Sequence, residues 1–267
     1  MVCPTPIGNL EDVTLRVLRS LGEVDVVACE DTRRTRVLLD RHGLKASLVA
    51  FHEHNEDARA SDLVERMRSG ATVALVSDAG MPLVSDPGYV LVRACVAAGV
   101  PVEVLPGASA VLVALVASAL PADRWRFAGF LPRKRAELLR VLAEPGGTLV
   151  AFESPRRLPA TLSALAEIDP ERPAAVCREL TKLHEEVVRG SATELAERYA
   201  GAPPRGEVVL VVGAAPDVGA GSDPRAVEAL ERLVDAGARR RAAAAVVAEL
   251  TGESANALYR ATHRPCS

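Results

Sequence analysis

Apolar runs of strand length alternate with helical patterns along the first hundred residues. The runs are VDVVAC (24–29), SLVAF (47–51), TVALVS (72–77) and VPVEVL (100–105). The stretches between them carry apolar residues at i, i+3 and i+4, which is the spacing of one helical face. Continuous apolar strands that alternate with helices predict a parallel sheet covered on both faces.

A second series of apolar runs begins near Trp125, and its strands lie closer together. The expected strands are TLVAFE (148–153), PAAVCREL (173–180), EEVVRG (185–190) and EVVLVVG (207–213). Two of them follow each other almost directly, so this half is predicted to be mixed or antiparallel. Its expected helices are ELLRVLAE, PATLSALAEI and ATELAERYA. The segment PGASAVLVALVASALPADR would connect the two domains.

The end of the chain changes composition twice. The stretch AAPDVGAGSDP is rich in Gly and Pro and predicts a linker. Beyond it, two or three short helices are expected, and TGES between the last two helical patterns resembles the turn of a helix-turn-helix. A small helical cap is the alternative interpretation of this tail. The expected division is a domain at 1–108, a domain at 109–214, a linker at 215–224 and a helical tail at 225–267.

Composition bears on three properties of the protein: membrane insertion, redox compartment and nucleic-acid binding. The 267 residues are 49% hydrophobic, yet no apolar run reaches the roughly 18 residues of a membrane span. Five scattered cysteines without a CxxC pair argue against disulfides and structural zinc, and favour a reducing, cytoplasmic location. The net charge of −3 means that any nucleic-acid binding must use a local basic patch.

Three loops rich in Gly and Pro are expected at one edge of the first sheet. TPIGNLED follows the presumed first strand, SDAGMP follows TVALV, and PGAS follows VEVL. Ligands of open α/β sheets bind at the carboxyl ends of the strands, and Gly lets backbone groups approach them closely. Each loop alone is also an ordinary strand–helix turn, and none holds the GxGxxG or GxxxxGK[ST] fingerprint.

Two charged stretches have competing interpretations. In CEDTRRTR (29–36), Asp31 or Thr32 can cap a helix whose arginines are solvated, with Glu30 paired to one of them. The same stretch can instead supply a base and an anion clamp. The FHEHNE stretch (51–56) has too few ligands to predict a metal, so substrate hydrogen bonding or loop polarity is favoured. We expect no metal site.

Nine motifs taken in order resemble one family over residues 1–213. That family is the bacterial small-subunit ribosomal-RNA cytidine 2′-O-methyltransferases, within the tetrapyrrole (corrin/porphyrin) methylase superfamily. The motifs are TPIGNLEDVTLR, VACEDTRRTRVLL, EHNE, ALVSDAGMPLVSDPG, LPGASA, GFLPRK, FESPRRL, CRELTKLHEEVVRG and GEVVLVV. Cys3-Pro4 departs from the expected pattern and leaves the pairing of the first strand open.

The resemblance implies two α/β domains of tetrapyrrole-methylase type, with S-adenosylmethionine in the cleft between them and a small C-terminal helical extension. It further implies a homodimer that 2′-O-methylates a cytidine ribose in 16S ribosomal RNA, as free RNA or in the assembled 30S subunit. The residues it assigns to the donor are Pro6, Ile7, Asp78, Ala79, Gly80, Met81, Ser109, Ala110, Phe152, Cys177 and Leu180.

The implied chemistry is an in-line displacement in which the ribose hydroxyl attacks the methyl carbon. Positioning can supply ~7–11 kcal/mol, and a general base adds ~10²–10⁴-fold. Our candidates for the base are Asp31, Glu30 and a neutral Lys182, in that order. The residues expected to contact RNA are Arg33, Arg36, His54, Asn55 and Arg156.

Two alternatives of different classes stay open at this point. A small-molecule tetrapyrrole or precorrin methylase would share the donor loops but would not need EDTRRTR or the basic tail. A non-catalytic ribosome-binding protein would need the basic patches but no donor cleft.

Overall fold

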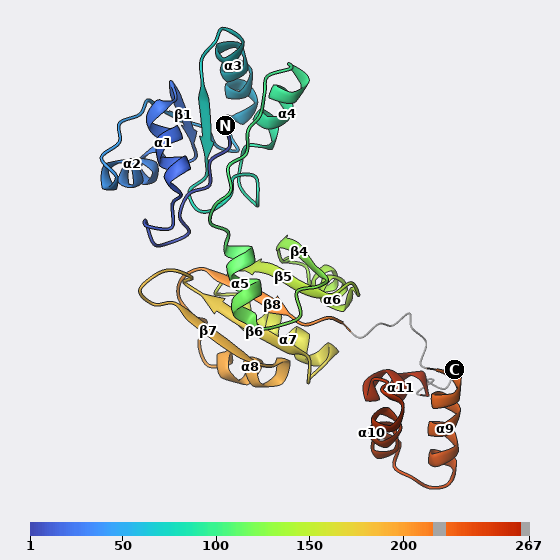
Figure 1. The fold of residues 1–267 in the computed structure, drawn as a ribbon. Helices are drawn as coiled ribbons and strands as arrows, with labels where there is room; N and C mark the ends of the chain where they lie inside the picture. Colours follow the sequence, from blue (N-terminus) through green and yellow to red (C-terminus); the bar gives the residue numbers. More distant parts are fainter. Residues whose placement is uncertain (216–222, 263–267) are drawn as a thin grey trace.

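Two separate β-sheets form the body of the protein, and a helical tail follows them (Figure 1). The computed structural model describes residues 1–215 and 223–262. None of the helices in this described part of the chain is both long and apolar enough to cross a membrane. The predicted α/β class is confirmed, and most of the predicted linker lies outside the described residues.

The first sheet is parallel and is covered on both faces, as its continuous apolar strands predict. Its strands, in the order β2-β1-β3, are β2 Leu48–Ala50, β1 Val26–Cys29 and β3 Val73–Val76. The helices are α1 Leu15–Glu23, α2 Thr32–Arg41, α3 Glu56–Arg68 and α4 Tyr89–Ala97. Helices α1 and α2 pack on one face and α3 and α4 on the other, each pair with its own apolar cluster (Figure 1).

The predicted strand at 100–105 is wrong as a continuous element. Only single bridges are formed here, from Val2 to Leu75 on β3 and from Val2 to Val104. The backbone N–H of Val2 donates to Glu103 and that of Leu105 donates to Val2. Prolines explain the short pairing, because Pro4 and Pro101 lack the N–H that would extend the ladder.

The second sheet has five strands and is mixed, as predicted. In the order β4-β5-β8-β6-β7, they are Trp125–Phe130, Thr148–Glu153, Val208–Val212, Pro173–Arg178 and Glu186–Ser191. Strands β4 and β5 are parallel, whereas the other three pairs are antiparallel. Strand β4 was not among the strands we predicted, because its side chains are half-buried at most and its register shifts between Phe127 and Phe130.

Helices cover the two faces of the second sheet unequally. Helices α6 (Arg135–Ala143), α7 (Leu158–Ile168) and α8 (Ala192–Tyr199) bury one face. The other face packs against α5 (Ala110–Ser118), and Ile7 from the first domain joins the same apolar cluster. The first domain therefore contacts the second sheet on the face that α5 covers.

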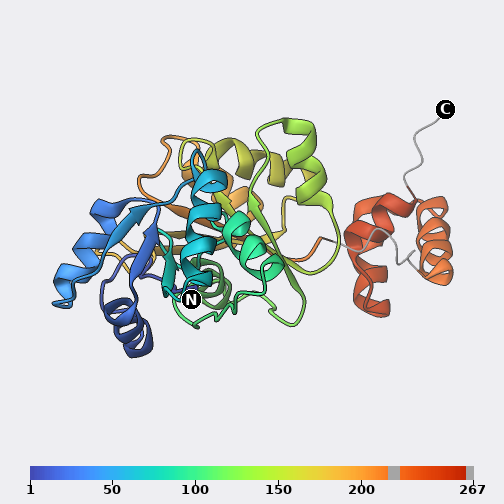
Figure 2. The ribbon, with the colours of Figure 1, turned by 90° about the horizontal axis from the view of Figure 1, so that it is seen from above.

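The described part of the tail, up to residue 262, contains three helices that bury apolar side chains against one another. They are α9 Pro224–Asp235, α10 Arg240–Thr251 and α11 Ala255–Ala261. Leu230, Val247 and Leu258 form the centre of their small core. Gly252 ends α10 with a φ of +75°, within the predicted TGES turn. Figures 1 and 2 both draw the three helices to one side of the two sheets.

Candidate functional site

The three Gly/Pro loops of the first domain meet at one edge of its sheet, as predicted. The backbones of Thr5 and Gly80 exchange two hydrogen bonds, of 2.9 and 3.0 Å. A Cβ built on Gly80 would lie 3.2 Å from Ile7 Cγ2, and one on Gly107 would lie 2.7 Å from Pro4 Cβ. Small residues therefore let these backbones approach one another closely.

The segment from Ser77 to Gly88 is a constrained double turn. Leu83 and Ser85 have φ angles of +72° and +66°, which cost free energy for residues with a Cβ, and Gly88 has a φ of +128°. The Ser77 hydroxyl donates to the carbonyl of Gly80 over 3.1 Å. Glu56 from α3 accepts a hydrogen bond from the Gly88 N–H over 3.3 Å. The second turn is thus fixed by a residue from the start of α3.

Two cavities lie between the domains. The Arg34 cavity has a volume of about 360 Å³, and it is lined on one side by Thr5, Ile7, Arg34 and Asp78 and on the other by Lys182 and Glu207. The Phe152 cavity has a volume of about 330 Å³ and is lined by Val84, Asp86, Ala110, Phe130, Phe152 and Glu153, among others. Ile7, Ala79 and Glu207 line both. The two cavities therefore adjoin.

The predicted donor residues distribute unevenly around these cavities. Pro6, Ile7, Asp78 and Ala79 line the Arg34 cavity, and Ile7, Ala79, Ala110 and Phe152 line the Phe152 cavity. The remaining five, Gly80, Met81, Ser109, Cys177 and Leu180, line neither. Four of them have structural roles: Gly80 pairs with Thr5, Ser109 caps α5, and Cys177 and Leu180 are buried in the core.

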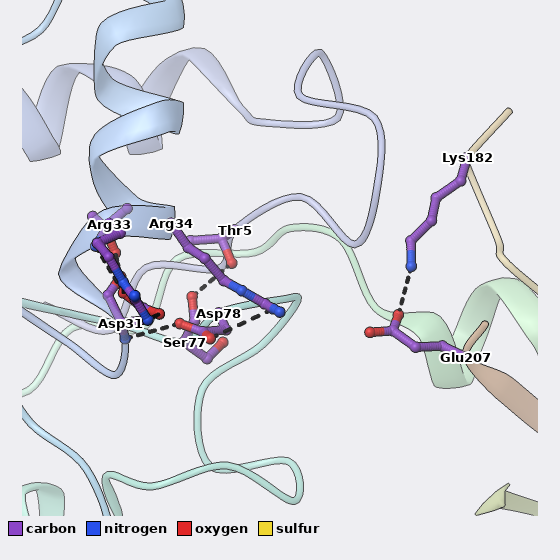
Figure 3. A network of polar contacts seen from close by, with 9 residues as sticks. Thr5, Asp31, Arg33, Arg34, Ser77, Asp78, Lys182 and Glu207 are labelled. Atoms are coloured by element: carbon purple, nitrogen blue, oxygen red, sulfur yellow. Dashed lines mark hydrogen bonds and ion pairs between the residues drawn. The ribbon is translucent and has the colours of Figure 1, made fainter. Parts of the chain in front are cut away.

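Asp78 is held firmly at the mouth of the Arg34 cavity. One carboxylate oxygen accepts a hydrogen bond from the backbone N–H of Asp31 over 3.0 Å, and the other lies 3.5 Å from the Arg34 guanidinium (Figure 3). The Thr5 hydroxyl donates to the carbonyl of Ser77 over 3.0 Å. These contacts join the loops after β1 and β3 to the N-terminal loop.

Asp31 is the N-cap of α2, which is the structural role that the sequence left open for it. Its carboxylate accepts from the Arg33 backbone N–H over 2.8 Å and from the Arg33 side chain over 3.0 and 2.7 Å. The Arg33 side chain, then the Arg33 N–H, hold the pKa of Asp31 well below its ordinary value. A carboxylate bound this way has little affinity for a proton, which counts against the first-ranked candidate for the base.

Glu30 and Lys182 have raised pKa values for opposite reasons. Burial disfavours the charged form of Glu30 and raises its pKa, and the charge of Asp78 adds to this, while Arg34 and His52 act against it. For Lys182, burial alone would lower the pKa, but hydrogen bonds to Glu207 and Glu179, each 2.9 Å long, raise it. The neutral amine that a lysine base requires is therefore disfavoured in this structure.

Asp86 is a cavity residue that the sequence reasoning did not select. It lines the Phe152 cavity, and burial raises its pKa to about 6, with a further contribution from the charge of Glu30. Asp86 lies within the motif ALVSDAGMPLVSDPG, to which the sequence analysis gave donor residues only between Asp78 and Met81. The sequence does carry one indication of a role for Asp86, because SDPG (85–88) repeats the pattern of SDAG (77–80) after the same buried strand.

The predicted RNA-contacting residues lie on both domains. Arg33 and Arg36 are exposed on α2, His54 is exposed in the loop before α3, and Arg156 is exposed in the loop after β5. Asn55 is used locally, because its side chain accepts from the His52 N–H over 2.9 Å and donates to Ala50 over 3.2 Å.

Cysteines and possible metal ligands contribute no further site in the described residues. Cys3, Cys29, Cys95 and Cys177 are free and buried, while Cys266 lies outside the described residues. Within residues 1–215 and 223–262, no group of three or more His, Cys, Asp or Glu side chains could hold a metal ion.

The chain is similar to known proteins over most of its length. A family model described as tetrapyrrole (corrin/porphyrin) methylases matches residues 2–196. A protein of Mesorhizobium japonicum named "Ribosomal RNA small subunit methyltransferase I" is 47% identical over 96% of this chain and 88% of its own length. A Thermotoga maritima protein of the same name is 44% identical over 79% of this chain and 96% of its own.

Solved structures give the same picture at the level of the fold. Uroporphyrin-III-C-methyltransferase from Thermus thermophilus superposes with a TM-score of 0.56 at 28% identity, over 79% of this chain and 92% of that one. A structure of that enzyme complexed with S-adenyl homocysteine superposes with a TM-score of 0.56 at 23% identity, over 79% of this chain and 95% of that one.

Proposed function

Because the chain belongs to the tetrapyrrole (corrin/porphyrin) methylase family, we propose that it methylates the ribose 2′-hydroxyl of a cytidine in small-subunit ribosomal RNA, with S-adenosylmethionine as the donor. The observation that carries this proposal is the identity of 42–47% to proteins named for methylation of small-subunit ribosomal RNA. The solved tetrapyrrole enzymes are more distant in sequence, at 28% identity or less.

The Phe152 cavity fits a donor of this kind. Its volume of about 330 Å³ is in the range of small-molecule sites. The Phe152 ring meets Phe127 edge-on at a centroid distance of 5.0 Å and Phe130 at a tilt at 5.4 Å. Phe130 and Phe152 give the cavity an aromatic wall for an adenine ring.

The Arg34 cavity fits the acceptor strand. Arg34, whose side chain is 64% exposed, supplies a cation that can pair with phosphate, and Arg33, Arg36 and Arg156 add exposed positive charge around the cleft. Because Ile7 and Ala79 line both cavities, a ribose in one would meet a donor in the other. This arrangement supports the two-substrate reaction.

When bound, S-adenosylmethionine supplies a methyl group activated by a positively charged sulfur. The residues of this chain would contribute to the reaction in three ways. The apolar walls of the Phe152 cavity exclude water, and Arg34 with the exposed arginines around the cleft orients the phosphate backbone. A carboxylate must accept the proton that the ribose hydroxyl loses.

A homodimer belongs to this proposal and is supported by α5. One face of this helix packs in the core, while Leu112 and Val116 on the opposite side are 51% and 79% exposed. An apolar helix face left open in this way is typical of a contact between subunits. We assign a second copy of the chain to it. Val116→Glu should give a monomer in analytical ultracentrifugation, and an unchanged dimer would exclude this face.

The remaining partners follow from the same proposal. The substrate is small-subunit ribosomal RNA, as free RNA or in the 30S subunit, and the reaction takes place in the cytoplasm. Four free, buried cysteines are consistent with a reducing compartment.

Methyl transfer from radiolabelled donor tests the proposal against its alternatives. We expect label in RNA from unmodified 30S subunits and none in uroporphyrinogen. Label in the tetrapyrrole alone would favour a small-molecule methylase. A protein whose melting temperature does not respond to S-adenosylmethionine, and which transfers no label, would be a binding protein instead.

A further inference from the structure

Three carboxylates line the Phe152 cavity, and two of them are already occupied. Glu153 is completely buried, accepts from the Thr161 hydroxyl over 2.5 Å and pairs with Arg157 at 3.2 Å. Glu207 pairs with the Lys182 ammonium at 2.9 Å. The carboxylate oxygens of Glu153 and Glu207 are therefore already engaged by cations and hydroxyl donors.

Asp86, the third carboxylate, has no such partner. No cation among the described residues forms an ion pair with it within 4 Å, and the Ser77 hydroxyl is the hydrogen-bonding neighbour that favours its charged form. The Arg34 cavity offers no substitute, because Asp78 there is bound by the Asp31 N–H and by Arg34. Among the described cavity residues, Asp86 thus has carboxylate oxygens that are free of cations.

The backbone around Asp86 is built to hold it at the cleft. Ser85, directly before it, adopts a φ of +66°, which only a constrained turn maintains in a residue with a side chain. Val84 packs into the apolar cluster of α5 and the second sheet, so the turn is anchored to the opposite domain. Glu56 fixes the other end of the turn through the Gly88 N–H. The carboxylate is therefore placed where the two domains face each other.

The charges around Asp86 suit proton transfer near neutral pH. Burial is the main cause that raises its pKa to about 6, followed by the negative charge of Glu30; the Ser77 hydrogen bond lowers it, and Asp78 raises it slightly. From the other elements, Glu153 and Glu207 line the same cavity in paired form. A base works best when its pKa lies near the working pH.

We propose that Asp86 is the general base of the methyl transfer, an inference that rests on the proposed function. A carboxylate oxygen of Asp86 takes the proton as the O–H bond of the ribose breaks. The electron pair of that bond forms the new oxygen–carbon bond to the methyl group. The carbon–sulfur pair stays on sulfur, which leaves a neutral thioether, and no other reactant is needed.

Asp86→Asn tests this role, because it keeps the shape of the side chain and removes its basicity. We expect the rate constant for methyl transfer to 30S subunits to fall by at least ~10²-fold. The affinity for S-adenosylhomocysteine in calorimetry should stay within about twofold. Asp57→Asn, at an exposed site in the first turn of α3, is the matched control and should leave both values unchanged.

The pH dependence separates a base from a merely structural residue. In the wild type, the transfer rate should fall as pH drops from 7 to 5, because Asp86 becomes protonated. Carbon-13 NMR of the free protein should show one carboxyl that titrates near pH 6 and disappears from the spectrum of Asp86→Asn.

Several results would overturn the inference. They are a rate in Asp86→Asn within threefold of the wild type, a variant that loses donor affinity but keeps its maximal rate, and a wild-type rate that does not fall between pH 7 and 5. The pH dependence of the wild-type rate tests the inference even if Asp86→Asn does not fold. A wild type that methylates no RNA would instead refute the proposed function.

Discussion

Gly80 has a φ of +79° at the point where the turn after β3 pairs with Thr5. A side chain in this conformation costs ~1–2 kcal/mol, and a Cβ here would lie 3.2 Å from Ile7 Cγ2. We expect Gly80→Val to weaken S-adenosylhomocysteine binding by at least ~1.4 kcal/mol, a tenfold change, in calorimetry. Ile7 would be displaced in both cavities.

Gly99 offers the control for this substitution. It has a similar φ of +69°, but a Cβ there would meet nothing within 4 Å. Gly99→Val should therefore carry the backbone strain without the loss of donor affinity. Equal affinities in the two variants would place the donor away from the Gly80 turn.

At the residue scale, the sequence could indicate which loops matter but not which side chains in them are free. Asp31 ranked first because it stands beside arginines, yet the same arginine, Arg33, occupies its carboxylate. Asp86 was passed over because its burial depends on the packing of Val84 against the other domain. Long-range burial of this kind leaves no pattern in a single sequence.

At the element scale, helix α2 presents a basic face whose role can be measured. Arg36 is exposed and forms no ion pair within the described residues, while Arg33 is exposed but holds Asp31. Arg33→Ala with Arg36→Ala should reduce the salt-dependence slope of RNA binding by about 0.7–0.9 for each lost phosphate contact. Donor affinity should not change.

The matched variant for α2 is Arg93→Ala on α4, which removes an exposed positive charge from the other face of the sheet. The salt-dependence slope of RNA binding by Arg93→Ala should equal that of the wild type. If the α2 variant also keeps the wild-type slope, these arginines only stabilise the start of the helix and its cap.

Secondary structure was predictable where hydrophobic periodicity was strong. The buried strands β1, β3 and β8 and the helix α7, expected as PATLSALAEI, agree with the prediction within a few residues. The strand predicted at 100–105 is not formed, because its apolar run contains Pro101 and its β-bridge pairing is limited to Val2. Strand β4 was missed because its exposed ends and the bulge beside Gly129 hide the alternation that marks a strand.

At the scale of the whole molecule, the cleft depends on contacts between loops distant in sequence. The Asn9 N–H donates to the Thr181 hydroxyl over 3.0 Å, and Gly8 leaves no room for a Cβ, which would lie 2.5 Å from Lys182 Cγ. Motif order indicated a cleft between two domains only through family resemblance. Composition and periodicity alone could not have placed residue 8 beside residue 182.

The tail is a further proposal at this scale, as a part that engages the substrate. Its three helices share their own apolar core, and Arg239 and Arg241 are exposed at the start of α10, where the helix dipole disfavours positive charge. Arg240 is used internally and donates to the carbonyl of Thr262 over 3.1 Å. The two exposed arginines are therefore available for an anion.

A chain that ends at Asp223 should keep its fold and its affinity for S-adenosylhomocysteine. Methyl transfer to 30S subunits should lose efficiency mainly through a higher KM, as expected when uniform binding is removed. An unchanged kcat/KM would reduce the tail to a cap, and precipitation or lost donor binding would make it part of the main core.

The position of the transferred methyl group tests the central claim most directly. Methylation of the 2′-oxygen blocks alkaline cleavage at the adjacent phosphate, so RNA labelled by this protein should yield its radioactivity in an alkali-resistant dinucleotide that contains 2′-O-methylcytidine. Label released as a mononucleotide methylated on its base, or label found in no RNA at all, would contradict the account.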